Sequence, residues 1–259
     1  MTRHDKIDAT TESSTPWNVT TLTLTDDTVK KPIQCHQYAP YSPTLIFTHG
    51  AGGTLSVEAV VNFCTGFCST LPVLAFQGSM NLKARTQQFR ACKAKLYNVH
   101  EGRRKSKAGD GMRERKHRVL LGGRSMGARA AVIAASEDLV EQDDERDEVR
   151  VWLVLVSYPL QGPKGDVRDQ ILLHLPKMAS VLFVVGDEDA MCPLELLDET
   201  KSEMMATSQL VVVRGADHGM NVKPASMTKE LEEEAGRVAA RWVEDGLKED
   251  VTYIGEERD

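Results

Sequence analysis

The sequence predicts an α/β protein with a mostly parallel, twisted sheet and helices on both faces. The first observation behind this prediction is that short apolar runs alternate with longer segments whose apolar residues recur at helical spacing. The second is that these runs are apolar throughout and end in glycine-rich or polar turns, which is typical of strands buried on both faces. Strands and helices that alternate in this way form a parallel sheet between two layers of helices.

An opening hairpin is expected first, because Thr20 to Thr25 alternates, Asp26-Asp27 can turn, and Pro32 to Tyr38 can return. Buried strands are then expected at 44–47, 73–76, the run after Arg118, 151–156, 181–185 and 210–213. The expected helices are 56–70, 86–99, the alanine-rich segment after Ser125, 193–206 and 226–247. No internal repeat or linker divides this series, so we expect one domain over 18–259, preceded by a flexible tail over 1–17.

Composition narrows the class of protein. The chain has 259 residues, of which 41% are hydrophobic and 27% charged, so it can bury the core of a single α/β domain. Its net charge of −6 gives no general affinity for nucleic acid. The chain has five cysteines without paired spacing, which is typical of a reduced protein. It has no apolar leader, and no apolar run approaches the length of about 20 residues that spans a bilayer, so we expect a soluble protein. We expect a cytoplasmic or nuclear location and no membrane.

A Gly-x-Ser-x-Gly turn at Gly123, Ser125 and Gly127 joins an apolar strand to an alanine-rich helix. That context is what a nucleophile elbow requires. Glycines flank the serine because the strand and helix backbones must cross closely there. A helix that begins at the serine also turns its free N–H groups and positive dipole end toward developing negative charge.

Candidate chemical groups stand at the carboxyl ends of four expected strands: His49-Gly50-Ala51, Ser125, Asp189 and His218. In open parallel sheets the functional site lies at this edge. A serine needs a base to take its proton, histidine suits that role, and a carboxylate can fix the imidazole tautomer. The order serine, acid, histidine is that of α/β-hydrolases. We therefore assign Ser125 as nucleophile, His218 as base and Asp189 as the orienting acid, with Asp187 as the alternative acid.

The oxyanion of an acyl-transfer reaction needs backbone donors. Met126 N–H is expected to supply one, and Ala51 N–H the other, with Gly52 as the alternate. Beside these groups, the candidate pocket-lining residues are His49, Arg124, Tyr158 and Cys192. His49 is expected to shape the oxyanion loop rather than act as a base.

Two further patterns have ordinary interpretations. Cys64 and Cys68 are one helical turn apart without a second ligand pair, which favours core packing over a metal site. The basic insertion at about 103–116 fits a solvated loop, with a nuclear localisation signal or a phosphate-binding patch as the alternative. We expect no metal and no organic cofactor.

Several segments resemble the testis-expressed protein 30 family of the α/β-hydrolase superfamily. This family also includes the hydrolase-like domain of the third subunit of a nuclear histone-acetyltransferase (NSL) complex, and it is more distantly similar to dienelactone hydrolases. The similar segments are His49-Gly50-Ala51-Gly52-Gly53, Gly122-Gly123-Arg124-Ser125-Met126-Gly127-Ala128-Arg129-Ala130-Ala131, Ser157-Tyr158-Pro159-Leu160, Asp189-Ala190-Met191-Cys192 and Asp217-His218-Gly219-Met220.

The resemblance covers about 43–245 and implies an α/β-hydrolase fold with a minimal lid. By motif, it places the family's triad on Ser125, Asp189 and His218, while the N-terminal extension and the basic insertion depart from the family pattern. The leading hypothesis is a serine hydrolase that cleaves a small-molecule carboxylic ester or thioester through an acyl-enzyme. The alternative is a catalytically silent scaffold that binds a protein partner.

Overall fold

The computed structural model describes residues 11–12, 19–105, 118–140 and 150–256. These residues form one ten-stranded sheet of order β1-β2-β3-β5-β4-β6-β7-β8-β9-β10. The strands are β1 (Thr11–Glu12), β2 (Val19–Leu24), β3 (Ile33–Tyr38), β4 (Leu45–Thr48), β5 (Val73–Phe76), β6 (Arg118–Arg124), β7 (Arg150–Val156), β8 (Ala179–Gly186), β9 (Thr207–Val213) and β10 (Val251–Ile254). The helices are α1 (Glu58–Cys68), α2 (Leu82–Lys105), α3 (Met126–Val140), α4 (Gln170–Leu173), α5 (Leu194–Glu203) and α6 (Thr228–Asp245), with a 3-10 turn at Ala225–Met227.

The sheet is antiparallel at one end and parallel through the rest. The pairs β1–β2, β2–β3 and β3–β5 are antiparallel, whereas every pair from β5 to β10 is parallel. The opening hairpin and the mostly parallel sheet are therefore as predicted. Among the described residues, no helix is both long and apolar enough to cross a membrane.

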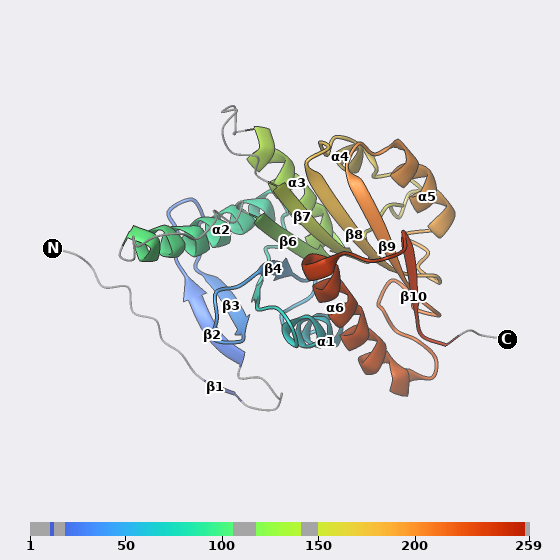
Figure 1. The fold of residues 1–259 in the computed structure, drawn as a ribbon, viewed down its shortest axis with the longest axis horizontal. Helices are drawn as coiled ribbons and strands as arrows, with labels where there is room; N and C mark the ends of the chain where they lie inside the picture. The colour runs from blue at the N-terminus through green and yellow to red at the C-terminus, as the bar shows by residue number, and fades with distance from the viewer. Residues whose placement is uncertain (1–10, 13–18, 106–117, 141–149, 257–259) are drawn as a thin grey trace.

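Helices cover both faces of this sheet. Figure 1 shows α1 beside α6 on one face, with α2 and α3 on the opposite face. Neighbouring strand residues alternate between the two resulting cores: Ile46 packs with the α2–α3 side and Phe47 with the α1–α6 side. The strands are buried on both faces for this reason, which explains their uninterrupted apolar runs.

The chain reverses its direction of travel across the sheet at β4. From β4 it moves to β5 on one side, and α2 then returns it to β6 on the other side of β4. The loops after β4 and β6 therefore leave neighbouring strands in opposite directions. Open α/β sheets bind ligands at the carboxyl ends of the strands where the chain reverses in this way. The fold thus brings the His49–Gly53 loop next to Ser125.

Some element boundaries differ from the predictions. Helix α2 begins at Leu82, earlier than expected, because the Asn81 side chain accepts the Ala84 N–H as a cap. The edge strand β10 was not predicted at all, and β9 begins three residues early, at Thr207. Between β7 and β8 the chain holds only α4 and an isolated bridge from Gln161 to Val167, in keeping with a minimal lid.

The predicted N-terminal tail and basic insertion fall mostly outside the described residues. Within the tail, Thr11 and Glu12 pair with Thr20 and Val19 as β1, a strand that was not predicted. The start of the insertion, 103–105, is the last part of α2.

Helices α1 and α6 touch at backbone distance. A Cβ added to Gly236 would lie 2.2 Å from the Phe63 carbonyl oxygen, and one added to Gly66 would lie 1.9 Å from the Glu233 oxygen. Near this contact the Asn62 side chain donates a hydrogen bond of 2.7 Å to the carboxylate of Glu232, which is only 3% exposed. Both features make the α1–α6 contact sensitive to single substitutions.

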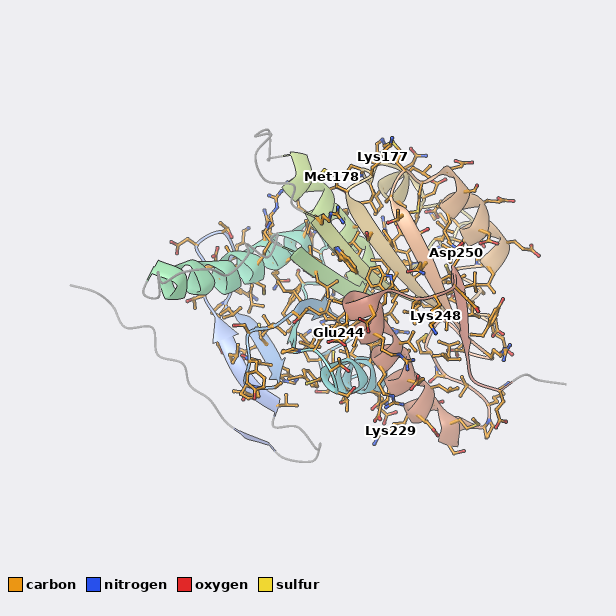
Figure 2. All side chains as sticks on the ribbon, viewed as in Figure 1. Lys177, Met178, Lys229, Glu244, Lys248 and Asp250 are labelled. Carbon is orange, nitrogen blue, oxygen red and sulfur yellow. The ribbon has the colours of Figure 1, made fainter. Side chains whose placement is uncertain are left out.

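We predict that Gly236→Ala destabilises the protein by about 1–3 kcal/mol, because the new methyl group overpacks the contact with α1. At a solvent-exposed helix position, Gly→Ala would stabilise a protein by about 1 kcal/mol. A loss of stability in Gly236→Ala therefore identifies the clash. Urea unfolding measures the difference. Glu244→Ala on the exposed surface of α6 (Figure 2) is the control, expected to stay within about 0.5 kcal/mol of wild type. A Gly236→Ala protein as stable as wild type would contradict the close packing.

The second prediction concerns Glu232. Burial raises its pKa to about 7, against the lowering effects of the Asn62 hydrogen bond and the Arg124 charge. The folded protein therefore keeps a proton that the unfolded chain, with a carboxyl pKa of about 4.3, releases between these pH values. Because the folded state binds more protons there, this group makes stability fall as the pH rises from about 4.5 to about 7.

Glu232→Gln keeps the acceptor for Asn62 but cannot ionise. We expect it to match wild type near pH 5 and to be more stable by about 1–3 kcal/mol near pH 8. Urea unfolding at both pH values tests this, with Glu244→Gln as the exposed control. A stability difference that does not change with pH would contradict the prediction.

Candidate active site

The serine lies in a strained turn between β6 and α3. Ser125 has a φ of +53°, a conformation that side-chain-bearing residues rarely adopt. A Cβ on Gly123 would lie 2.5 Å from the Gly127 carbonyl carbon, and a Cβ on Gly127 would lie 2.7 Å from the carbonyl oxygens of both Thr48 and His49. Glycine at both positions therefore allows the strand, the helix and the loop after β4 to meet at the serine.

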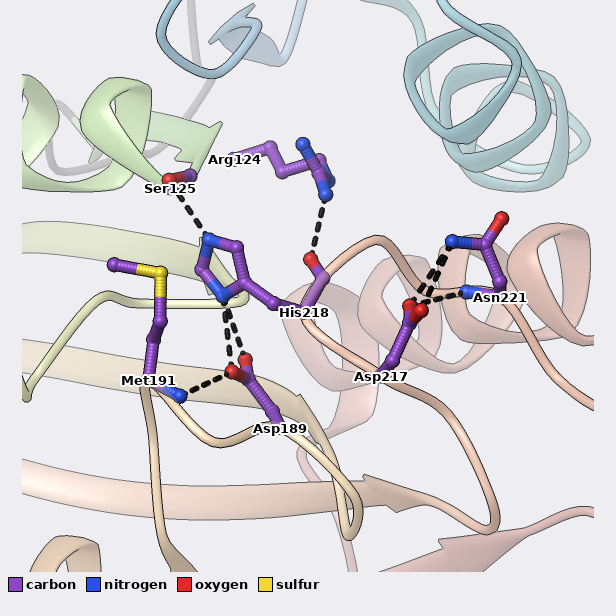
Figure 3. A network of polar contacts seen from close by, with 7 residues as sticks. All are labelled: Arg124, Ser125, Asp189, Met191, Asp217, His218 and Asn221. Carbon is purple, nitrogen blue, oxygen red and sulfur yellow. Dashed lines mark hydrogen bonds and ion pairs between the residues drawn. The ribbon is translucent and has the colours of Figure 1, made fainter. Parts of the chain in front are cut away.

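Three side chains from separate strand ends form a continuous chain of contacts (Figure 3). The hydroxyl of Ser125, after β6, lies 3.0 Å from Nε2 of His218, which follows β9. Nδ1 of His218 lies 2.9 Å from Oδ2 and 3.0 Å from Oδ1 of Asp189, which follows β8. Asp189 is 2% exposed, and its Oδ1 also accepts the Met191 N–H at 2.8 Å. The alternative acid, Asp187, instead accepts the Gly215 N–H.

The loop that carries His218 is held from two sides (Figure 3). Its Asp217 carboxylate accepts hydrogen bonds from the backbone and side-chain amides of Asn221, which closes a tight turn. On the other side, Nη2 of Arg124 donates to the His218 carbonyl oxygen. The residue before the serine thus anchors the backbone of the histidine.

Arg124 is half-buried and flanks the serine. The position that a Cβ of Gly50 would take lies 3.2 Å from Nη1 of Arg124 and 3.3 Å from Ser125 Cβ. Burial lowers the pKa of Arg124, and the charges of Glu232, Asp189 and Asp217 oppose that shift. Its buried Nε donates to no described residue. Of the predicted pocket-lining residues, Arg124 is the one placed beside Ser125.

The loop after β4 exposes Ala51 and Gly52 at the surface. Gly52 has a φ of +66°, and its N–H points to the Met80 sulfur at 3.1 Å. In the described part of the chain, neither Ala51 N–H nor Met126 N–H donates a hydrogen bond to another group. Of the two donors predicted on this loop, the Ala51 N–H is therefore free, whereas the Gly52 N–H already has an acceptor.

His49 lies beneath this loop and is 1% exposed. Its Nε2 accepts the Gly78 N–H at 3.0 Å and contacts the Gln77 amide nitrogen at 2.7 Å, while Nδ1 lies 2.7 Å from the Gly50 carbonyl oxygen. Burial lowers the pKa of His49, against the raising effect of its hydrogen bond to Gly50, and the nearby Arg85 charge lowers it further. This neutral histidine supports the loop and does not line an open pocket.

Tyr158 and Cys192 do not line a pocket either, so these two expectations were wrong. Both are 0% exposed and pack in the core on the α2–α3 side of the sheet. The Tyr158 hydroxyl donates to the Arg168 carbonyl, and burial raises the pKa of the Cys192 thiol to about 12. Each follows a strand end in the sequence, but its side chain points into the core.

Sequence reasoning missed Arg85, which is 0% exposed and donates to the carbonyl oxygens of both His49 and Gly50. The Asn81 cap signals that α2 begins before Arg85, but no sequence pattern indicates the burial of this side chain. Cys64 and Cys68 are buried and free, as core packing requires. Within the described residues, no cluster of three or more histidine, cysteine or acidic side chains is placed to hold a metal.

Comparisons with known proteins agree with this architecture. An α/β-hydrolase serine hydrolase homologue from Coxiella burnetii is 17% identical, with a TM-score of 0.57 over 88% of this chain and 99% of its own. The dienelactone hydrolase from Anabaena variabilis is 14% identical, with a TM-score of 0.62 over 89% and 98%. These likenesses confirm the α/β-hydrolase fold. The pattern of the alpha/beta hydrolase domain matches residues 41–244, and the chain therefore belongs to the α/β-hydrolase domain family.

Proposed function

We propose that this protein is a serine hydrolase that cleaves a small-molecule carboxylic ester or thioester. The observation that carries the proposal is the contact chain from Ser125 Oγ through the His218 ring to the Asp189 carboxylate. A buried carboxylate beside Nδ1 keeps the proton on that nitrogen, which leaves Nε2 free to accept the serine proton. The strained turn at Ser125 lifts its hydroxyl toward a bound substrate.

In the proposed reaction, Ser125 Oγ attacks the substrate carbonyl while His218 Nε2 takes its proton. The negative charge that develops on the carbonyl oxygen is held by the N–H groups of Met126, at the start of α3, and Ala51. His218 then gives the proton to the departing alcohol or thiol, which leaves an acyl group on Ser125. Water, deprotonated by His218, attacks this acyl-enzyme. The bond between the acyl carbon and Ser125 Oγ then breaks, His218 returns the proton to Oγ, and the carboxylic acid is released.

Other features are in keeping with this function. The relatives in solved structures are described as a serine hydrolase homologue and a dienelactone hydrolase. The minimal lid between β7 and β8 suits small or solvent-exposed acyl groups rather than long lipid chains. The finer resemblance to the testis-expressed protein 30 family stays a prediction.

The function predicts stoichiometric labelling of Ser125 by a fluorophosphonate, because this reagent needs an activated serine. Intact-mass spectrometry of the protein should show one adduct, absent from Ser125→Ala and strongly slowed in His218→Ala and Asp189→Asn. Ester turnover should fall by about 10⁴-fold in Asp189→Asn, which leaves the wrong imidazole tautomer.

Asp187→Asn is the matched control, since the new amide oxygen can still accept the Gly215 N–H. We expect it to label at a rate close to that of wild type. Folded wild-type protein without an adduct, or an adduct that persists in Ser125→Ala, would overturn the proposed function. An absent adduct would favour the non-catalytic scaffold.

A further inference from the structure

The guanidinium of Arg85 is spread across two loops. Nε donates to the Ser79 carbonyl oxygen at 2.8 Å, and Nη2 to that of Gly78 at 3.3 Å, both after β5. Nη1 donates to the His49 carbonyl oxygen and, at 3.3 Å, to that of Gly50, both after β4. All three nitrogens of one buried side chain are therefore committed to backbone carbonyls.

A buried guanidinium is unfavourable unless nearby groups compensate its charge. Among the described residues, no carboxylate pairs with Arg85, although an unpaired buried charge is strongly unfavourable. Burial lowers the pKa of Arg85 to about 10, which leaves the side chain charged at neutral pH. A Cβ on Gly78 would lie 2.5 Å from Nε, so glycine there provides the space for the guanidinium. The four carbonyls are what compensate the charge.

One of these carbonyls belongs to the peptide group that carries the proposed oxyanion donor. The Gly50 carbonyl and the Ala51 N–H are two ends of the same planar amide. The Gly50 oxygen accepts from Arg85 Nη1, lies 2.7 Å from His49 Nδ1 and accepts the Gly53 N–H at 3.4 Å. Donors at a carbonyl oxygen polarise the amide, so its N–H becomes a stronger donor.

The contact between His49 Nδ1 and the Gly50 oxygen polarises the peptide only if Nδ1 carries the proton and donates it. A backbone N–H can only donate, so Nε2 of His49 must accept from Gly78 and carries no proton. The proton of the neutral ring is then on Nδ1, where it is donated to the Gly50 oxygen. Arg85 and His49 thus act on the Gly50 carbonyl in the same sense.

We propose that Arg85 is a positioning residue of the oxyanion hole, which holds the Gly50–Ala51 peptide in place and polarises the Ala51 N–H. This inference rests on the proposed serine-hydrolase function. It assigns to Arg85 an effect on the transition state, through Ala51, rather than on substrate binding. The expected signature is therefore a loss in kcat with KM nearly unchanged.

The test compares Arg85→Lys and Arg85→Met with Arg90→Lys. A lysine keeps the charge but lacks the planar fork that reaches both loops. Arg90 lies on the same helix and pairs with Glu137 of α3 at 2.6 Å, so its substitution controls for general damage to α2. The assays are hydrolysis of p-nitrophenyl acetate and inhibition by a trifluoromethyl ketone, which forms a tetrahedral adduct on serine.

We expect Arg85→Lys to lower kcat by about 10- to 100-fold, and to weaken the trifluoromethyl ketone by a similar factor, because the oxyanion donor is displaced. Arg85→Met should lose more, and Arg90→Lys should match wild type. Arg85→Lys decides the question if Arg85→Met fails to fold.

Folded Arg85→Lys with the kcat of wild type, a loss confined to KM, or an equal loss in Arg90→Lys would overturn the positioning role alone. Wild-type protein without a fluorophosphonate adduct at Ser125 would instead overturn the proposed function and this role together. Labelling of the wild-type protein therefore distinguishes a failure of the positioning role from a failure of the proposed function.

Discussion

The site depends on one close backbone contact, between the first turn of α3 and the end of β4. Gly127 lies against the carbonyl oxygens of Thr48 and His49 with no room for a side chain. Because β4 and β6 are neighbours at the reversal of the sheet, this contact fixes the loop after β4 relative to the nucleophile turn. A single methyl group at Gly127 would push Ser125 and the Met126 N–H away from the loop that carries the Ala51 N–H.

Parallel sheets leave polar backbone unpaired where their strands end, and these groups need partners when they are buried. Here the partners come from side chains of the loops and helices themselves. Arg85 joins the loops after β4 and β5, His49 bridges the same loops from the opposite direction, and Arg124 joins the nucleophile turn to the His218 loop. Loops held in this way can keep catalytic geometry without a lid packed over them.

The sequence predicted what repeats along the chain and missed what depends on three-dimensional packing. The buried strands were visible because apolar runs are required between two helix layers. Ser125, Asp189 and His218 were predicted to form one site because each follows such a strand, and their side chains are in contact in the structure. Strand-end position does not reveal side-chain direction, which is why Tyr158 and Cys192 were misplaced. Arg85 had no local signal, since a buried arginine looks like any helix-surface arginine in a one-dimensional pattern. The edge strand β10 was missed because it is half-exposed and short.

The two arginines near the site show why the guanidinium suits it. Each side chain reaches carbonyl oxygens of a loop that its own backbone does not contact. A planar guanidinium can do so because it loses little conformational entropy for each hydrogen bond that it forms. Arg124 lies within the field of Glu232, Asp189 and Asp217, so its charge is balanced at a distance without an ion pair in the described chain. Within the described residues, the hydrogen-bond acceptors of Arg85 are all backbone carbonyls, and no carboxylate pairs with it. Its charge acts on four carbonyl groups, and the Gly50 carbonyl is one of them. In our proposal, this difference in surroundings separates Arg124, which anchors the His218 loop, from Arg85, which polarises the Gly50–Ala51 peptide.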